Sequence, residues 1–383
     1  ASSPARAQSS DALAEALYNS ALELMEAGKD AEACPKLKQS QEIDPAVDAL
    51  SPDNKLIMVT GPLTGTMAST GGRYSVVTKS PLTGAIACSN SGGFIGAEMK
   101  MAGWDMIIFE GKSDSPVYLH VENEKAELLP ADDLWGKSVW ETDELLHRKH
   151  QDPQLRISTI GRAAEAGCLF SAVVNDLHRA AGRSGVGTGM ASKKRTAVAV
   201  RGTKGVGNIK DPARFMQEVA NQKQVLADNA VTGQGLPTYG TQVLMNVINE
   251  VGAMPTRNMR EVQFDGAEKI SGEAMHEPRA SDGKPNLTTN AGCFGCTIAC
   301  GRISTVDQGH FSVENKPEYW GNSGGLEYEA AWALGSDTGV DDQRHCGAVL
   351  VDVLQVHFHR PRRRDEVLAR GAAGGAGEAD ARS

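Results

Sequence analysis

Residues 290–302 read NAGCFGCTIACGR and place Cys293, Cys296 and Cys300 at the spacing C-x2-C-x3-C. Three of the seven cysteines of the chain therefore lie close together in one short run. Thiolates at this spacing can bind one soft metal centre, and the Gly and Ala residues between them let the backbone turn its amides towards sulfur. A structural zinc site usually has two ligand pairs, whereas three ligands in one run and a distant fourth are typical of a four-iron cluster. We therefore predict an iron–sulfur cluster, with three buried thiols in a helical turn as the alternative; no fourth cysteine is obvious.

Composition narrows the class of protein. A chain of 383 residues predicts two or three domains, enough to bury a large cofactor. The net charge of -9 argues against a nucleic-acid-binding surface, because phosphate contacts need a basic face. The cysteines outside the run are scattered, which suits a reducing compartment better than a disulfide scaffold. No apolar run reaches the roughly 18–20 residues of a membrane span, and no apolar segment precedes the Ala-x-Ala triplet near the start. We therefore expect a soluble, cytoplasmic protein that binds neither membrane nor nucleic acid.

Hydrophobic periodicity divides the chain into four parts. Residues 1–46 contain two helical runs that resemble a single tetratricopeptide-type hairpin. Because one repeat cannot bury its own face, this hairpin either docks on the rest of the chain or is a foreign remnant of something longer. Residues 47–210 alternate short β-rich runs with turns rich in Gly, Ser, Thr and Pro. Residues 211–342 are mainly helical and carry the three cysteines, and residues 343–383 form an unrelated or disordered tail. The predicted fold class is α+β, with a β-rich N-terminal cofactor domain and then a mainly helical domain. The β-rich runs are residues 56–60, 105–109, 117–121, 156–160 and 196–200.

Two loops of the β-rich part combine many glycines with few cations. The first, residues 61–96, includes Arg73, and the second, residues 175–189, reads NDLHRAAGRSGVGTG and includes Arg179 and Arg183. Glycine permits close backbone approach, and an arginine fork adds bidentate phosphate contacts. Neither loop contains a known nucleotide-binding signature, and each taken alone is more readily structural. Together, in one domain upstream of three cysteines, they predict a large phosphorylated cofactor beside a redox cluster.

Two carboxylates begin a further helical pattern in the second half. Residues 324–339, GGLEYEAAWALGSDTG, place Glu327 and Glu329 at its start. Carboxylates in a first turn usually complement the helix dipole. A glutamate that faces a metal centre acts instead as an acid–base catalyst. Both interpretations stay open at this point.

Seven segments occur in the order in which the aldehyde:ferredoxin oxidoreductase family of tungsten enzymes has them. They are GPLTGT, GGRYSVVTKSPLTG, NSGGFIGAEMKMAGWDMIIFEGK, NDLHRAAGRSGVG, PTRN, CFGCTIACGR and EYEAAWALGS, and the resemblance covers about residues 47–342. The resemblance implies tungsten, or molybdenum, held by two pterin cofactors, with Mg²⁺ bridging the pterin phosphates and one 4Fe–4S cluster nearby. It implies a β domain that cradles the pterins and mostly helical domains that close over them.

The resemblance also assigns roles to individual residues. It implies that Arg73 belongs to the first pterin loop and that Asn90 and Gly92 lie near the phosphates and magnesium. Glu329, with Glu327 as second choice, matches the glutamate near the metal. The residues that match the second pterin loop are Arg179, Ala180, Gly182 and Arg183, and the first three cluster ligands are Cys293, Cys296 and Cys300.

The implied reaction is oxidation of a small aldehyde to a carboxylic acid, with a proton moved by Glu329 and electrons passed through the cluster to ferredoxin. Two alternatives stay open: the tungsten subunit of a benzoyl-CoA-reductase-type enzyme, and a helical-repeat binding or scaffold protein. Homo-oligomer formation is also left open. The family's first strands are not seen, and the similarity stops after Asp342, ahead of the family's fourth cluster cysteine. We therefore expect an incomplete or inactive polypeptide, whether a genuine fusion or a chimeric or frameshifted reading frame.

Overall fold

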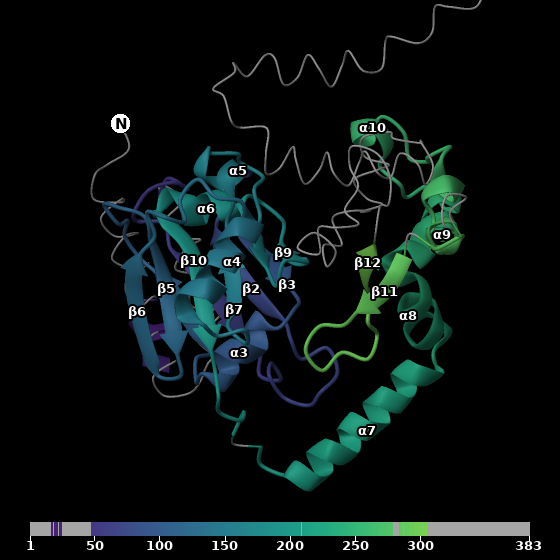
Figure 1. The fold of residues 1–383 in the computed structure, drawn as a ribbon, viewed down its shortest axis with the longest axis horizontal. Helices are drawn as coiled ribbons and strands as arrows, with labels where there is room; N and C mark the ends of the chain where they lie inside the picture. Colours follow the sequence, from purple (N-terminus) through teal and green to yellow (C-terminus); the bar gives the residue numbers. More distant parts are fainter. Residues whose placement is uncertain are drawn as a thin grey trace, which may run out of the picture.

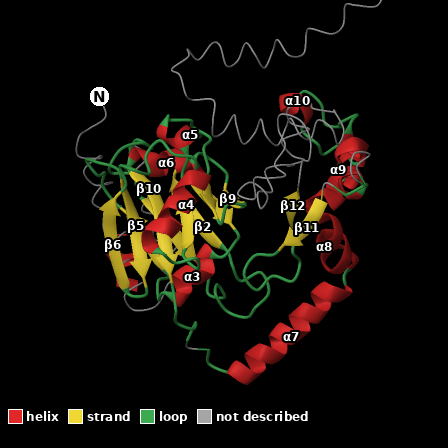
Figure 2. Cartoon of the chain, in the orientation of Figure 1, coloured by secondary structure: helices red, strands yellow, loops and turns green. Residues whose placement is uncertain are grey.

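The structure, a computed structural model, describes residues 17, 19–21, 23, 24, 47–207, 209–278, 283–285 and 287–304 of the chain. The described chain forms two parts, a two-sheet part up to about residue 207 and a mainly helical part that ends in a β-hairpin (Figure 1). Strands dominate the first part and helices the second (Figure 2). The structure is therefore a mixture of helices and several sheets, as the sequence predicted.

The first sheet has the strand order β3-β2-β1-β4, and neighbouring strands are antiparallel. Its strand β1 reads LIMVT and is apolar on both faces: Leu56 and Met58 face one core, while Ile57 packs on the other side. A strand of this kind is stable only where both faces of the sheet are covered. The strands are β1 (Leu56–Thr60), β2 (Tyr74–Lys79), β3 (Ile86–Ser91) and β4 (Met106–Phe109).

The second sheet has the order β6-β5-β10-β7-β8-β9. Strand β10 lies parallel to β5 and antiparallel to β7, and it is almost entirely buried. The strands are β5 (Val117–Glu122), β6 (Lys125–Pro130), β7 (Arg156–Thr159), β8 (Val173–Asn175), β9 (Arg179–Ala181) and β10 (Arg195–Arg201).

The main hydrophobic core lies between the two sheets. Met58 from the first sheet and Val198 from the second belong to it, and Met99 of α3 (Ile95–Met101) and Met190 of α6 (Val186–Ser192) complete it. Each such buried side chain contributes about 1.5–3 kcal/mol through the apolar area it removes from water. A short helix, α5 (Arg162–Glu165), lies between β7 and β8 in the chain.

Helix α4 (Val139–His150) covers the outer face of the second sheet. Ser138 and Glu141 form a capping box at its first turn, which satisfies backbone N–H groups that would otherwise lack partners. The helix ends at Gln151, which adopts a left-handed conformation. Leu146 packs with Ile157 of the second sheet in a separate core, so this sheet is also covered on both faces.

The predicted N-terminal hairpin lies largely outside the described residues. Its described residues, at positions 17, 19–21, 23 and 24, are helical. Ala21 is fully buried and packs with Ile57 and Met106 on the outer face of the first sheet. This part of the segment therefore docks on the sheet, while its assignment as a tetratricopeptide-type repeat stays a prediction.

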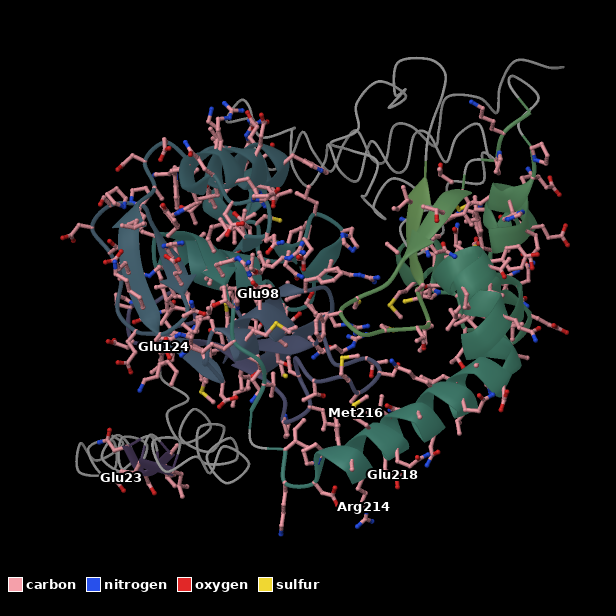
Figure 3. The ribbon with its side chains drawn as sticks, turned by 60° about the horizontal axis from the view of Figure 1, so that its bottom comes forward. Glu23, Glu98, Glu124, Arg214, Met216 and Glu218 are labelled. Carbon is pink, nitrogen blue, oxygen red and sulfur yellow. The ribbon has the colours of Figure 1, made fainter. Side chains whose placement is uncertain are left out.

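The second part begins with α7 (Pro212–Asp228). Asp211 precedes it and accepts a hydrogen bond from the Arg214 backbone N–H at 3.0 Å, and proline occupies the first helical position. Val219 is the buried residue of α7, and Figure 3 shows Arg214, Met216 and Glu218 projecting from the helix. In the described ranges, no helix has the length and apolar character needed to cross a membrane.

Short helical turns follow α7 and pack around a small core that contains Met245, Phe264 and Ile270. A hairpin of two antiparallel strands, β11 and β12, then carries the cysteine run. The elements are η1 (Ala230–Gly235), α8 (Leu236–Tyr239), η2 (Gly240–Leu244), α9 (Met245–Glu250), α10 (Thr256–Met259), η3 (Ala267–Ile270), α11 (Gly272–His276), β11 (Leu287–Ala291) and β12 (Gly301–Ser304).

Candidate cofactor site

The first predicted loop contains an exposed polar pair on strands β2 and β3. Asn90 of β3 lies opposite Ser75 of β2, and Arg73 immediately precedes β2. The Arg73 guanidinium donates a hydrogen bond to Asn90 Oδ1, while Asn90 Nδ2 donates to the Tyr74 carbonyl at 3.1 Å. Arg73 and Asn90 are both exposed, so the strand pairing displays them together on the surface.

The second predicted loop lies beside the same strand. It forms the turn of the β8–β9 hairpin and the segment that leads into α6. The Arg183 backbone N–H donates to Ser89 Oγ of β3 at 3.0 Å, and Ser80 Oγ donates to the Ser184 carbonyl at 2.7 Å. Ser89 directly precedes Asn90, so the structure brings the two loops together along β3. The exposed residues of the second loop include Ala180, Gly182 and Arg183.

A buried polar cluster holds the two loops against each other. Asn175, only 1% exposed, accepts hydrogen bonds from Ser91 Oγ at 2.6 Å and from the Tyr74 hydroxyl at 3.3 Å. Its Nδ2 donates to the Gly92 carbonyl at 2.9 Å. Burial raises the pKa of Tyr74 far above its ordinary value, so the hydroxyl stays protonated and remains a donor. The backbone around Gly92 is thus fixed by the residue that ends β8.

The three cysteines lie in the loop that joins β11 to β12, and not in the helical turn of the alternative interpretation. All three are half-buried, and none forms a disulfide. The Phe294 backbone N–H donates to the Gly93 carbonyl at 3.0 Å. A Cβ atom added at Gly92 would lie 2.7 Å from Cys293 Sγ, so this thiol packs directly on the first loop.

Arg179 connects the second loop to the cysteine hairpin. Its Nη2 donates to the Ala291 carbonyl at 3.4 Å and would lie 2.5 Å from a Cβ added at Gly301. Its Nε is buried and has no hydrogen-bond partner within the described part of the chain. The three segments that the sequence singled out separately therefore meet at one place.

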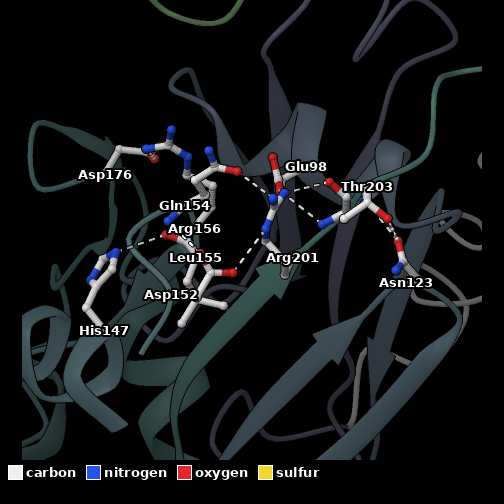
Figure 4. Close-up of polar contacts among 11 residues, drawn as sticks. Glu98, Asn123, His147, Asp152, Gln154, Leu155, Arg156, Asp176, Arg201 and Thr203 are labelled. Atoms are coloured by element: carbon white, nitrogen blue, oxygen red, sulfur yellow. Dashed lines mark hydrogen bonds and ion pairs between the residues drawn. The ribbon is translucent and has the colours of Figure 1, made fainter. Parts of the chain in front are cut away.

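The arginines of this place differ from structural arginines elsewhere in the fold. Among the described residues, no carboxylate lies within ion-pair distance of Arg73, Arg179 or Arg183. By contrast, Arg201 is paired with Glu98 at 2.9 Å and with another carboxylate at 3.0 Å (Figure 4). The site therefore presents uncompensated positive charge, which suits a ligand that carries phosphate groups.

The cysteine loop offers three thiols on one short segment, and all three are half-buried. Thiolates are the ligands that hold iron–sulfur clusters, so the chemistry of these donors fits such a cluster. Within the described ranges, no group of three His, Cys, Asp or Glu side chains is arranged to hold a metal ion.

Glu327 and Glu329 lie outside the described residues. The structure also adds Asn175 and Asp176, which sequence reasoning passed over. Their signal in the sequence was a polar pair directly after the apolar Val173–Val174 of β8.

Comparison with known proteins gives consistent matches. Residues 31–202 match the family model described as aldehyde ferredoxin oxidoreductase, N-terminal domain, and residues 217–349 match that of domains 2 and 3. A tungsten-containing aldehyde ferredoxin oxidoreductase from Pyrococcus abyssi is 48% identical over 302 residues, which are 79% of this chain and 47% of that protein. The protein of the same name from Pyrococcus furiosus is 45% identical over the same length. The chain thus spans about half the length of the curated relatives it matches.

Two more distant similarities are also found. A Pyrococcus furiosus protein named aliphatic sulfonate oxidoreductase, WOR-like subunit, is 28% identical over 290 residues, covering 71% of this chain and 44% of that protein. A solved structure, the active site complex BamBC of benzoyl coenzyme A reductase with 1,5-dienoyl-CoA, is 29% identical and superposes with a TM-score of 0.56. This similarity covers 69% of the present chain and 41% of the solved one.

Proposed function

Because the chain belongs to the aldehyde ferredoxin oxidoreductase family, we propose that it binds a tungsten–pterin cofactor and a 4Fe–4S cluster and oxidises aldehydes to carboxylic acids, with ferredoxin as electron acceptor. The observation that carries the proposal is the meeting of two arginine-bearing loops and a three-cysteine loop along β3. Family membership supports the tungsten–pterin cofactor, and the unpaired arginines support phosphate groups at this place.

The two loops are the proposed binding site of the pterin phosphates. Arg73 and Arg183 are exposed and contact consecutive residues of β3, whose side chains point to opposite faces of this edge strand. We propose that the two guanidinium groups reach one ligand from the two sides of the strand edge. Gly182 leaves backbone open next to Arg183, since a Cβ there would meet little but Ala180. Mg²⁺ commonly takes much of its coordination from ligand phosphates and water. We therefore propose that the phosphates themselves supply most of its coordination, with Asn90 near the ion.

Cys293, Cys296 and Cys300 are the proposed thiolate ligands of the cluster. Arg179 reaches from the second loop to the cysteine hairpin and so lies between the proposed phosphate and cluster sites. A cation in that position stabilises negative charge on either side of it. Its proposed role is to hold the two sites at a fixed separation while compensating part of their charge.

When bound, a tungsten–pterin cofactor supplies a two-electron acceptor, so that an aldehyde and water give a carboxylic acid, two protons and two electrons. A carboxylate within reach of the carbonyl carbon must take up one of these protons. Glu329, or Glu327 in its place, is the proposed residue for this transfer. The cysteine loop would then serve as the exit for single electrons towards ferredoxin.

The proposal is tested on protein purified without oxygen. Elemental analysis is expected to find tungsten or molybdenum with about four iron atoms per chain, and an aldehyde is expected to reduce a viologen dye. Replacing Cys296 by serine should remove the iron and the dye reduction. Cys168→Ser is the matched control, because this cysteine is also half-buried but lies outside the loop. Unchanged iron in the Cys296→Ser protein contradicts the ligand assignment, and a metal-free wild-type chain supports the scaffold alternative.

A second candidate rests on the similarity to the benzoyl coenzyme A reductase structure. That activity would run in the reductive direction on a thioester. The higher identity to the aldehyde enzymes, 48% against 29%, favours the first candidate. Spectra of the dithionite-reduced protein decide between them, since an aromatic coenzyme A thioester would reoxidise a reductase, and an aldehyde would not.

A further inference from the structure

Asp176 lies at the turn between β8 and β9, and its side chain is almost completely buried, with 3% exposed. One carboxylate oxygen, Oδ2, accepts hydrogen bonds from the Phe94 backbone N–H at 2.8 Å and from Asn175 Nδ2 at 2.7 Å. The other, Oδ1, lies 3.9 Å from Arg156 Nη1 (Figure 4). Oδ1 accepts no hydrogen bond from the described residues, and a buried carboxylate oxygen without one is costly, which indicates that Asp176 has a functional role.

The Phe94 N–H belongs to the same peptide unit as the Gly93 carbonyl. That carbonyl accepts the hydrogen bond from the Phe294 N–H, next to Cys293. In a trans peptide the N–H and C=O point in opposite directions. The Gly93–Phe94 peptide plane is therefore held from one side by Asp176 and from the other by the cysteine loop. A charged acceptor on the N–H also polarises the unit, which strengthens the hydrogen bond to its carbonyl.

The local packing is specific for an aspartate opposite a glycine. Gly93 has a φ of +96°, and a Cβ there would overlap both Asp176 Oδ2 and Asn175 Nδ2. Glycine at this position thus lets the carboxylate come close enough to bind the following amide. Arg156, the cation nearest to Asp176 Oδ1, also contacts Phe94: its guanidinium lies 4.7 Å from the centre of the Phe94 ring.

The backbone of the same turn sets the position of Arg179. Asp176 and Leu177 both have left-handed conformations, with φ of 50° and 58°. Such conformations are costly for residues other than glycine, and they persist where the surroundings fix them. Here the hydrogen bonds of the Asp176 carboxylate fix the turn, which leads directly into Arg179 at the start of β9.

We propose that Asp176 is a positioning residue that sets the cysteine loop against the arginine-bearing loops through the Gly93–Phe94 peptide. This proposal rests on the function proposed above, because Cys293 needs to be positioned only if it is a ligand of the cluster.

The first test uses the full chain without metal and measures the alkylation rate of each cysteine by mass spectrometry. Asp176→Ala removes the acceptor and is expected to speed alkylation of Cys293 by at least about tenfold, because a buried hydrogen bond to a charged group is lost. Asp176→Asn keeps the shape with a neutral acceptor and is expected to give a smaller increase. The rate at Cys168, in the two-sheet part, is expected to stay unchanged. If Cys168 accelerates as much as Cys293, the variant only loosens the whole fold and the positioning role is overturned.

The matched control is Glu141→Gln. Glu141 also binds a backbone N–H at a helix start, that of Ser138 at 2.8 Å, and pairs with an arginine at 3.0 Å. It lies in α4 on the outer face of the second sheet. This variant is expected to leave the Cys293 rate unchanged, and an equal acceleration there would overturn the proposal.

The second test uses protein loaded with iron. Asp176→Asn removes a negative charge near the cysteine loop, and a more positive midpoint potential of the bound cluster is expected, because added electrons are repelled less. If the wild-type chain binds no iron, the proposed function fails. The alkylation rates then still test whether Asp176 holds the cysteine loop through the Gly93–Phe94 peptide. If iron binds and neither the Cys293 rate nor the potential changes, the function stands and the positioning role of Asp176 fails.

Discussion

Loss of the Arg201 side chain, at the end of β10, is expected to weaken the two-sheet part. Its guanidinium binds Glu98 of α3 at 2.9 Å and Asp152 at 3.0 Å (Figure 4). Exposed fractions of 23% for the arginine and 12% for Glu98 make this pair largely buried. Arg201→Met keeps most of the hydrocarbon volume but leaves the carboxylates without their cation.

The expected loss can be bracketed. Removing one partner of a fully buried pair costs about 3–5 kcal/mol, whereas an exposed pair contributes about 0–1 kcal/mol. The partial exposure of Arg201 places its loss between these limits, at about 2–3 kcal/mol of unfolding free energy. For a part of this size, that corresponds to a fall in Tm of about 4–12 °C.

Thermal unfolding by calorimetry and urea unfolding by circular dichroism measure the effect. Arg148→Met is the control, because Arg148 pairs with Glu144 in the same protein but the two side chains are 67% and 69% exposed. The control should change stability by less than about 0.5 kcal/mol. Adding Glu98→Gln to Arg201→Met should recover part of the loss, since an unpaired buried carboxylate is removed. A change of less than about 0.5 kcal/mol in Arg201→Met would refute the reasoning.

Three further predictions concern other buried positions. Burial raises the pKa of Glu165 to about 7, so the stability that its protonated form contributes at low pH is lost as pH rises through 7. Because the side chain is partly exposed to solvent, we expect this loss to be about 1–2 kcal/mol; Glu165→Gln should remove it, and an unchanged difference between the urea midpoints at pH 5 and 8 would contradict this assignment. Burial lowers the pKa of Lys193 to about 8, so stability should rise with pH between about 8 and 10.5; Lys193→Met should abolish that rise, and its persistence would exclude this lysine as the cause. Gly93→Ala should lower stability by more than about 2 kcal/mol and speed Cys293 alkylation, whereas Gly84→Ala, also at positive φ but with open space around it, should cost only about 1 kcal/mol. If the two glycine variants lost equal stability, the loss would come from backbone strain alone and not from overlap of the new Cβ with Asp176 and Asn175.

The strands that the sequence predicted are those whose burial is encoded locally. The runs at 56–60 and 196–200 recur as β1 and β10 because nearly every side chain in them is apolar and both faces are covered. Strands β2 and β3 were hidden inside the first glycine-rich loop, and pairing between distant segments defines them: β2 pairs with β1, and β3 pairs with β2. Strands of three residues, such as β8, are too short for any periodic signal.

The segments of the candidate site and their proximity were predictable from the sequence, but the contacts between them were not. Spacing alone identified the cysteine run, and glycine with arginine identified the loops. The hydrogen bond between Gly93 and Phe294 joins residues far apart in the chain, and no local pattern encodes such a contact. In the sequence, Asp176 is indistinguishable from an ordinary loop residue. Its role depends on the Phe94 amide that it binds, and Phe94 is far from it in the chain.

Among the described residues, all strands of the two large sheets precede residue 202, and the cysteine hairpin follows the helices of the second part. During synthesis on the ribosome, strands β2, β3 and β9 can therefore fold before Cys293, Cys296 and Cys300 leave the ribosome. The hairpin then docks on a surface that is already formed. Pairings over such long separations form slowly, so a nascent chain should pass through a stage with its arginines in place and its thiols still reactive.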